Sequence, residues 1–414
     1  MGSYLDQIDA AAPEKRWPLV RQLMLNERQP FFRELRDERP VLELPDNIAF
    51  VTRYADCAMV LQRWHDFGVD LYEPKQGVYF MAQDDTPDHW RDKAIMRSIL
   101  DYEDIPAMRA FLGAKTREIL QDAGGTIDAP QALTRAVPVA LVQEFFGFTG
   151  ADPKKLQAWS YWNQQDAFHN QFFDKDVNPD PQHVINQRTR GNYQLAFYVG
   201  RLVLKRAIQV KFGGARNDSV TRLLRLSFSK GVKFPLRKVL TNVGGLLIGA
   251  VETTSNAVSN ALAELLSRPD VLARARGAAA KDDPKEFDGY VFEALRFNPA
   301  FPYFFRVCHK ATQLAGGTPH ARTVQPGTVV MPCTWSAMFD EATFADPDAF
   351  DPRRDITDTF TLGFGHHECL GYAIATAMIP EMVRQVLLMP EIRADGPVEF
   401  RGAVPEKQIL RWAA

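Results

Sequence analysis

The sequence predicts a mainly α-helical protein with a small β portion. Apolar residues recur at intervals of three and four through most of the chain, which is the pattern of helices that bury one face. Runs of β-favouring residues occur in two regions, 40–53 and 306–331, and the second region contains GG and PGT as turn signals. No repeat or low-complexity linker marks a domain boundary. The most regular helical patterns cover residues 17–35, 107–123, 138–148, 192–210 and 239–266.

The composition indicates a large folded protein without a strong overall charge. The 414 residues are 46% hydrophobic and 24% charged, which is enough apolar material for a large core. The formal net charge of -2 gives no global reason to expect nucleic acid or an anionic membrane as a partner. The first residues are too polar for a signal peptide, and the longest apolar run, 243–251, is too short to span a bilayer. We therefore expect a cytoplasmic protein with no membrane span.

Charge is distributed unevenly along the chain. Residues 201–238 contain eleven Lys or Arg and one acid, Asp218, which gives this segment a net charge of +10. A solvated helical face explains such a segment in most proteins. The alternative is a docking surface for an acidic partner or for the anionic tail of a substrate. Both interpretations remain open at the level of the sequence.

The four cysteines do not form a recognisable framework. Cys57, Cys308, Cys333 and Cys369 are scattered singly, without a C-x-x-C pair or histidines at zinc spacing. This excludes the usual patterns of a disulfide scaffold or a structural zinc site. Three of them are expected to be small buried hydrophobic residues. Cys369 alone has unusual neighbours.

The stretch FTLGFGHHECLGYAIA, residues 360–375, predicts a thiolate ligand. A single thiolate without companion ligands suits a metal whose other positions are filled by a macrocycle, and haem is that case. Gly363 and Gly365 allow the backbone to pass close to a flat ring, and the amides at the start of the following helix stabilise the anion of Cys369. The alternative is a glycine-rich turn around a buried cysteine.

This stretch resembles the haem-binding loop of the cytochrome P450 family, F-G-x-G-x-H-x-C-x-G. Leu362 stands where the family has phenylalanine. Leucine keeps the surroundings of the sulfur apolar, but the exchange can shift the reduction potential of the iron. The resemblance implies that Cys369 is the iron ligand and that the cofactor is haem b, iron protoporphyrin IX. The matching positions are Gly363, Gly365, His367, Cys369 and Gly371.

Two further segments resemble a structural signature of the same family. FEALRFNP contains E-x-x-R as Glu293 and Arg296, a spacing that places both side chains on one face of a helix. FADPDAFDPRR resembles the family segment that supplies a third member, here Arg354. The resemblance implies a structural triad of these three residues, which holds the core below the haem and does not touch substrate.

A third segment, GGLLIGAVETTSNAV, resembles the central helix of the family. Gly249, Ala250, Glu252, Thr253 and Thr254 stand at the positions of its A/G-G-x-D/E-T-T motif. Small residues there leave room for oxygen, and the resemblance implies that Glu252 and Thr253 relay the protons that cleavage of the O–O bond requires. The alternative is an ordinary buried helix whose threonines bond back to its own carbonyls.

The resemblance also implies contacts to the haem propionates. His89 matches the histidine of the family helix that reaches a propionate, and Lys93 stands where arginine is more usual. A lysine still neutralises a carboxylate, although without bidentate geometry. Arg306 and His367 occupy the positions of two further propionate partners.

The resemblance covers nearly the whole chain and predicts its fold and activity. It implies a single cytochrome P450 haem domain over residues 1–414, a triangular prism of helices around haem. It also implies a monooxygenase that inserts one oxygen atom from O2 into a C–H bond, with electrons from a ferredoxin or flavodoxin and its reductase. A peroxide-driven or isomerising haem-thiolate enzyme is the alternative, followed by a haem sensor or carrier without catalysis.

The expected substrate pocket is rich in aromatic residues. A hydrophobic small molecule, aromatic, terpenoid or fatty, fits such walls better than a small polar one, although aromatics at helical spacing are often core residues. The pocket residues implied by the resemblance are Tyr79, Phe80, Trp162, Phe168, Ala250, Phe301 and Phe304.

Overall fold

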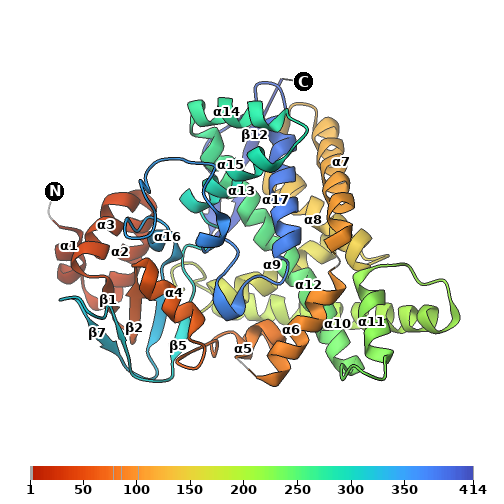
Figure 1. The fold of residues 1–414 in the computed structure, drawn as a ribbon, viewed down its shortest axis with the longest axis horizontal. Helices are drawn as coiled ribbons and strands as arrows, with labels where there is room; N and C mark the ends of the chain where they lie inside the picture. The colour runs from red at the N-terminus through yellow and green to blue at the C-terminus, as the bar shows by residue number, and fades with distance from the viewer. Residues whose placement is uncertain (1–2, 78, 85, 101, 414) are drawn as a thin grey trace.

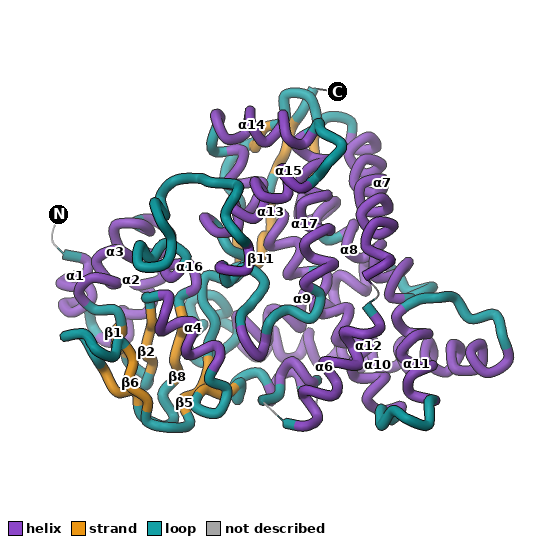
Figure 2. The backbone as a smooth tube through the Cα atoms, viewed as in Figure 1, coloured by secondary structure: helices purple, strands orange, loops and turns teal. Residues whose placement is uncertain are grey.

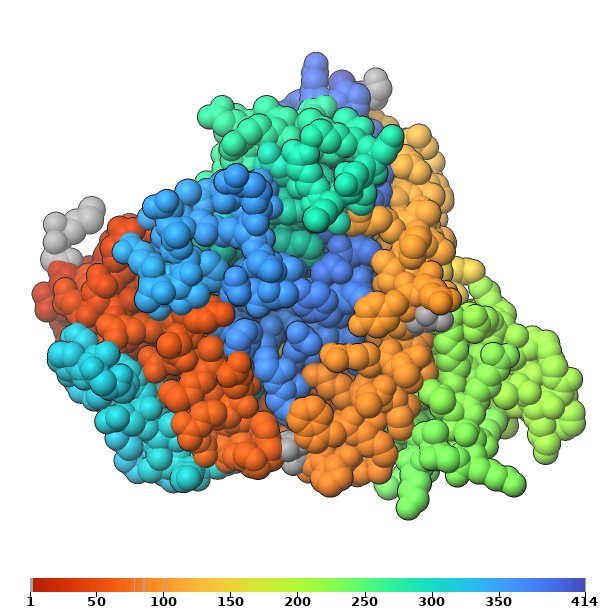
Figure 3. Space-filling model, viewed as in Figure 1, coloured from red at the N-terminus to blue at the C-terminus, as the bar shows by residue number. Residues whose placement is uncertain are grey.

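The computed structural model describes residues 3–77, 79–84, 86–100 and 102–413. Helices form most of the molecule, and the outline seen in Figure 3 is roughly triangular (Figures 1–3). The predicted fold class, mainly α with a small β portion, is therefore confirmed. The α-helices of the described residues are α1 (Tyr4–Ala10), α2 (Pro13–Asn26), α3 (Arg28–Glu38), α4 (Tyr54–Gln62), α5 (Glu73–Gln76), α6 (Pro87–Ile99), α7 (Ile105–Ala123), α8 (Ala136–Leu141), α9 (Pro153–His169), α10 (Pro181–Phe212), α11 (Ser219–Phe228), α12 (Leu236–Ala250), α13 (Glu252–Leu266), α14 (Pro269–Ala279), α15 (Lys285–Phe297), α16 (Thr334–Ala337) and α17 (Tyr372–Leu387).

The two predicted β regions meet in one five-stranded sheet, ordered β1-β2-β8-β5-β3. β1 and β2 form a hairpin whose turn residues Asp46 and Asn47 have φ of 62° and 58°, a left-handed conformation that Asp and Asn tolerate. β2 then pairs in parallel with β8, with Ile48 opposite Val329. The strands are β1 (Val41–Leu44), β2 (Ile48–Val51), β3 (Phe67–Gly68), β4 (Thr126–Asp128), β5 (Arg306–Cys308), β6 (Thr312–Leu314), β7 (Arg322–Val324), β8 (Val329–Pro332), β9 (Arg393–Ala394), β10 (Glu399–Arg401), β11 (Val404–Lys407) and β12 (Ile409–Arg411).

The main core lies among the helices, away from the sheet. α7, α13, α15 and α17 pack together, and their facing sides bury apolar residues such as Leu262 and Val386. A separate cluster fills the space between α2, α3 and the sheet, where Trp17 packs edge-on against Phe50. In Figure 1 the helical bundle and the sheet occupy different sides of the molecule. The cavity described below is lined by residues of both packed regions, among them Tyr72 from the second cluster and Leu246 from the main core.

The expected central helix over 239–266 is interrupted at Val251. α12 ends at Ala250, Val251 has φ -90° and ψ -66°, and α13 begins at Glu252. The carbonyls next to this break accept hydrogen bonds from side chains. Thr253 Oγ1 donates to Gly249 O at 2.6 Å, and Gln164 Nε2 donates to Ile248 O at 2.9 Å. Back-bonding of this kind bends or interrupts helices.

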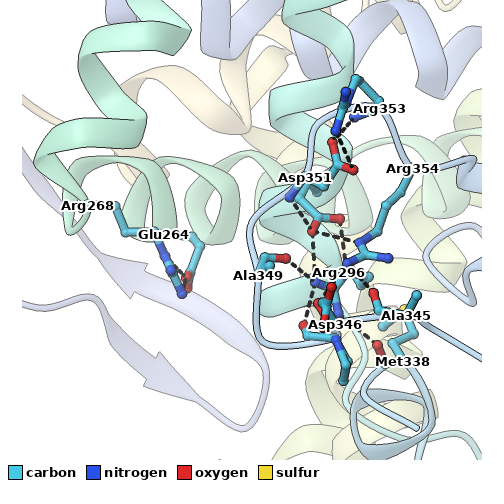
Figure 4. Close-up of polar contacts among 12 residues, drawn as sticks. Glu264, Arg268, Arg296, Met338, Ala345, Asp346, Ala349, Asp351, Arg353 and Arg354 are labelled. Carbon is cyan, nitrogen blue, oxygen red and sulfur yellow. Dashed lines mark hydrogen bonds and ion pairs between the residues drawn. The ribbon is translucent and has the colours of Figure 1, made fainter. Parts of the chain in front are cut away.

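Glu293, Arg296 and Arg354 meet in one ion-pair network, of which Figure 4 labels the two arginines. Arg296 donates to both carboxylate oxygens of Glu293 at 2.9 and 2.7 Å, and Arg354 Nε lies 3.3 Å from Glu293 Oε1. The Nη1 and Nη2 atoms of Arg296 also donate to the carbonyls of Met338 and Pro347, both at 2.8 Å, and Nη2 lies 3.3 Å from Ala349 O. The network thus ties α15 to residues 338–354, the segment that leads to the Cys369 loop.

We predict that Glu293→Gln lowers the free energy of unfolding by about 3–5 kcal/mol, because it leaves the charge of Arg296 buried without an anion. Urea unfolding followed by circular dichroism measures the change. Glu264→Gln is the matched control: Glu264 pairs with Arg268 at 2.6 Å, but that arginine side chain is 34% exposed. Loss of this pair is expected to cost less than about 1 kcal/mol. Equal losses in the two variants would contradict a structural role for the network.

Candidate active site

A cavity lies between α12, α13, α17 and the segment 361–371. Most of its wall is apolar, with aliphatic and aromatic side chains from widely separated parts of the chain. Cys369 lies in this wall, and so do Gly249, Ala250 and Thr253 from the two halves of the central helix. The structure therefore brings the glycine-rich loop and the G-A-x-E-T-T segment to the wall of one cavity.

The backbone of the loop presents the Cys369 thiol to the cavity. Cys369 N donates to Leu362 O at 2.9 Å, which closes the loop just before α17 begins. Gly363 and Gly365 have φ of 78° and 65°, the left-handed region that favours glycine, and a Cβ on Gly365 would come within 3.0 Å of Leu61 O. Burial raises the pKa of the Cys369 thiol, whereas the Gly371 N–H and the charge of Lys93 act in the opposite direction.

Two buried cations lie near the loop without a carboxylate partner. Lys93 Nζ donates to His366 O at 2.5 Å and Arg306 donates to Phe305 O at 2.8 Å, but neither forms an ion pair with a residue that the structure describes. Burial lowers the pKa of Lys93 to about 8 and also lowers that of Arg306. Buried charges normally have counter-charges, so this pair indicates an anionic ligand.

Three histidines pack beside these cations. The ring centroids of His89 and His366 are 3.9 Å apart, those of His89 and His367 are 5.1 Å apart, and His89 Nδ1 lies 2.8 Å from Phe80 O. Within the described ranges, both ring nitrogens of His367 and both of His366 are buried without a hydrogen-bond partner. Burial and the nearby cations hold the pKa of His367 well below its usual range and lower that of His366 to about 4.

These groups fit a haem with its two propionates. The wall offers one sulfur for the iron, the loop glycines leave space for a flat ring, and the adjacent cations and histidine nitrogens need an anionic acceptor. The structure brings together the predicted haem residues Cys369, Lys93, Arg306 and His367, with His89 in contact with His367. His366 was not predicted, although the HH pair in the sequence was the available signal.

The predicted relay partner Glu252 does not line the cavity. Its two carboxylate oxygens accept from Arg135 Nε at 3.0 and 2.9 Å, and its side chain is 1% exposed. Burial raises the pKa of Glu252 to about 7, and Arg135 opposes this shift. The carboxylate therefore points to the core while Thr253 lines the cavity, because adjacent residues of a helix face different directions. The structure does not bring the two groups together as a relay.

The structure divides the predicted pocket residues into two groups. Phe80 is fully buried in the core and gives its carbonyl to His89, and Trp162 packs edge-on against His183, on α10, and against Tyr161. Neither of them lines this cavity. Trp162 lies on a different side of α9 from Gln164 and Phe168, which do line it. The predicted residues that line the cavity are Tyr79, Phe168, Ala250, Phe301 and Phe304.

Tyr79 has a specific place in the cavity wall. A Cβ on Gly245 would lie 2.3 Å from the Tyr79 ring, so glycine at that position of α12 lets the ring rest on the helix. Burial raises the pKa of the Tyr79 hydroxyl, which makes no hydrogen bond to a described residue. Gln164, a second polar group in the wall, was not predicted, because a polar residue in a helical pattern does not reveal which cavity it faces.

The fold and this cavity together define a haem-thiolate protein. The family model for cytochrome P450 matches residues 117–281 and 287–391 of the chain. The protein therefore belongs to the cytochrome P450 family and is an oxidoreductase of the monooxygenase type. Within the described ranges, none of the helices combines the length and the apolar character that crossing a bilayer requires.

The chain is similar to several bacterial members of this family. Erythromycin C-12 hydroxylase of Saccharopolyspora erythraea is 27% identical over 349 residues, which cover 82% of this chain and 81% of that protein. The monooxygenase PikC of Streptomyces venezuelae is 26% identical over 86% of this chain and 82% of its own length. Among solved structures, CYP109Q5 from Chondromyces apiculatus has a TM-score of 0.76 at 22% identity, with 94% and 96% of the two chains covered. That likeness concerns the fold alone.

We predict opposite effects of Lys93→Met on the protein with and without haem. Loss of one charge-assisted hydrogen bond to a propionate should speed haem release about tenfold to a hundredfold, whereas the apoprotein should gain stability because a buried unpaired cation is removed. Transfer of haem to excess apomyoglobin and urea unfolding of the apoprotein measure the two effects.

Arg91→Gln is the matched control, because Arg91 lies on the same helix and is half-buried, with Asp88 and Asp92 as its partners. Haem release from this variant should match that of the unmodified protein. Unchanged release from Lys93→Met would contradict a propionate contact at Lys93.

Proposed function

We propose that residues 1–414 form one haem domain that binds haem b through Cys369 and inserts one oxygen atom from O2 into a C–H bond of a hydrophobic small molecule. One observation carries the proposal: Cys369, Arg306 and His367 line one apolar cavity, and the ring nitrogens of His367 have no hydrogen-bond partner among the described residues. The buried Lys93 lies next to His367, where it donates to His366 O. Haem with a thiolate ligand supplies oxygen activation when it is bound. Lys93, Arg306, His89 and His367 are proposed as its propionate partners.

The residues of the chain position the reaction and hold its protons. The Gly371 N–H and the start of α17 favour the thiolate form of Cys369, and the apolar wall keeps water from the reacting carbon. The Thr253 hydroxyl lies at the cavity surface and keeps its proton on Oγ1, from which it donates a hydrogen bond to Gly249 O. Glu252 can pass a proton to Thr253 only after its carboxylate leaves Arg135. We therefore assign Thr253 as the group that holds the proton at the cavity and Glu252 as the more distant proton source.

Electrons are proposed to come from a separate ferredoxin or flavodoxin with its reductase. The 414 residues contain no G-x-G-x-x-G nucleotide-binding fingerprint, so no dinucleotide site for a reductase is recognisable among them. A peroxide-driven or isomerising reaction is the alternative. The presence of Thr253 in the cavity wall favours the oxygen-dependent reaction, because a peroxide-driven enzyme needs no delivery of two protons to bound oxygen.

The proposed substrate is a hydrophobic molecule, aromatic, terpenoid or fatty, that also carries an oxygen able to accept a hydrogen bond. Phe168, Phe301 and Phe304 provide the apolar surface, and Tyr79 provides the donor. The relative from Saccharopolyspora erythraea is named for hydroxylation of erythromycin, and one solved relative holds testosterone. Erythromycin and testosterone each have a large apolar body with oxygen substituents. A substrate of this kind would fill the apolar cavity and accept a hydrogen bond from Tyr79.

The proposed reaction is tested with labelled oxygen. The reduced protein under carbon monoxide should show the red-shifted Soret band of a thiolate ligand, and turnover under 18O2 with a ferredoxin should place one label in the product. Thr253→Ala should bind haem normally but release hydrogen peroxide in place of most product, a loss of coupling of about a hundredfold. Thr253→Ser, which keeps the hydroxyl, is the control.

The same variants separate the two candidate reactions. If Thr253→Ala works as well as the unmodified protein with O2, while added hydrogen peroxide drives the unmodified protein faster than ferredoxin does, the peroxide-driven alternative holds. A Soret band typical of histidine ligation in folded protein would remove the basis of both reactions.

We predict that Tyr79→Phe weakens binding of a ketone about threefold to tenfold and leaves binding of the hydrocarbon with the same skeleton unchanged, because one hydrogen bond is lost. Titration of the haem spectrum measures both dissociation constants. Tyr303→Phe is the matched control, since Tyr303 is partly buried, packs edge-on against Trp17 and does not line the cavity. Equal weakening of the ketone and the hydrocarbon would mean that Tyr79 only fills space.

A further inference from the structure

Helix α10 carries large apolar side chains on two faces. Its inner face packs against the core through Leu195, Val199 and Val203. A second set of apolar side chains faces solvent, spaced four, seven, four and four residues apart, so that a turn of 100° per residue places them in one stripe. These residues and their exposed fractions are Tyr193 (76%), Phe197 (69%), Leu204 (65%), Ile208 (53%) and Phe212 (78%). We call this stripe, with Arg201 and Lys205, the α10 outer face.

The α10 outer face has positive charge and no negative charge. The 32 residues of α10 include no Asp or Glu. Arg190, Arg201, Lys205 and Lys211 are exposed, and none of them forms an ion pair with a described residue. Arg201 and Lys211 instead lie over the rings of Phe197 and Phe212, at 5.7 and 5.6 Å from the ring centroids. Cations and exposed apolar groups are therefore interleaved on one helix face.

The following segment extends the same chemistry. Arg225, Lys230, Lys233 and Arg237 are exposed without an ion pair among the described residues, while Phe228 and Leu236 are 53% and 46% exposed. The only acid in residues 201–238, Asp218, is buried and paired with Arg206 at 2.7 Å. In Figure 3 the light-green part of the chain that contains this segment projects from one corner of the molecule. Four of the eleven basic residues in 201–238 are held in ion pairs, namely Arg206, Arg216, Arg222 and Lys238. The other seven are exposed without an ion pair among the described residues, so most of the predicted excess charge lies on the surface.

We propose that the α10 outer face lies on an anionic phospholipid membrane. A helix in the membrane interface needs an apolar stripe with aromatic residues, flanked by Lys and Arg that meet the headgroups. A second copy of this chain does not suit the face, because pairing would bring cations against cations. The protruding aromatic side chains need no matching pocket in a bilayer, whereas a protein partner would have to supply one.

The surface is separate from the proposed active site. None of the residues in the α10 outer face lines the cavity that contains Cys369. The inference therefore goes beyond the oxidation reaction, and its failure would leave the proposed function untouched. Exposed residues also allow substitution without loss of the core.

Co-sedimentation of the haem-loaded protein with vesicles tests the proposal. Vesicles of phosphatidylcholine with one quarter phosphatidylglycerol should bind the protein at low salt, and pure phosphatidylcholine vesicles should bind it at least about tenfold more weakly. The double variant Arg201→Glu with Lys205→Glu should lose about tenfold or more in partitioning. Phe197→Ser with Ile208→Ser should lose binding by a similar factor, because the inserted apolar area is gone.

The control is the double variant Lys15→Glu with Lys310→Glu, which reverses two exposed charges on α2 and just after β5. Neither lysine forms an ion pair with a described residue. These changes should leave vesicle binding within about twofold of the unmodified protein. Circular dichroism melting confirms that every variant is folded. Absence of binding to the anionic vesicles, or equal losses in the control pair, would overturn the proposal. Binding to soluble polyglutamate without binding to vesicles would assign the face to an acidic protein and would overturn it as well.

Discussion

The position of the Cys369 sulfur depends on a short piece of backbone that two packed regions hold in place. The hydrogen bond from Cys369 N to Leu362 O closes the loop, and Gly363 and Gly365 supply left-handed bends that other residues adopt at a cost. On the N-terminal side, the buried Glu293 network fixes residues 338–354 against α15. On the C-terminal side, the loop runs directly into α17, which packs in the main core. A change in either region moves the sulfur relative to the cavity.

Charge in this protein is arranged according to what can neutralise it. Glu293 and Glu252 are buried, and each has both carboxylate oxygens within 3.0 Å of an arginine nitrogen. Lys93 and Arg306 are buried, and neither has a carboxylate partner in the part of the chain that the structure describes. An apoprotein with these two cations carries a free-energy cost that an anionic ligand relieves. The same electrostatic rule therefore separates the residues that hold the fold from those that are proposed to hold the cofactor.

The α10 outer face shows how a protein with almost no net charge can have a strongly charged surface. The net charge of -2 gives no reason to expect an anionic partner, yet Arg201 and Lys205 lie in a region with one acid that is already paired. Local charge within a Debye length, about 10 Å, decides what approaches such a surface. α10 meets the core with one apolar stripe and solvent with another, and this second stripe is outside the requirements of the fold.

The sequence by itself determined the helical fold class and the residues of the Cys369 loop, because periodicity and glycine spacing are local properties of a chain. It also brought Glu293, Arg296 and Arg354 into one hypothesis through their motifs. Only the tertiary structure decided which way side chains point: Glu252 faces Arg135, and Trp162 faces α10 instead of the cavity. Neighbouring positions on a helix differ by 100° in direction, so a motif locates a residue along the chain but not across it. Three residues of the site, Arg135, Gln164 and His366, could not be found in this way. Arg135 and Gln164 are far from the Cys369 loop in the sequence, and His366 cannot be told from its neighbour His367 by residue type. Only the packing of the folded chain shows which groups they contact.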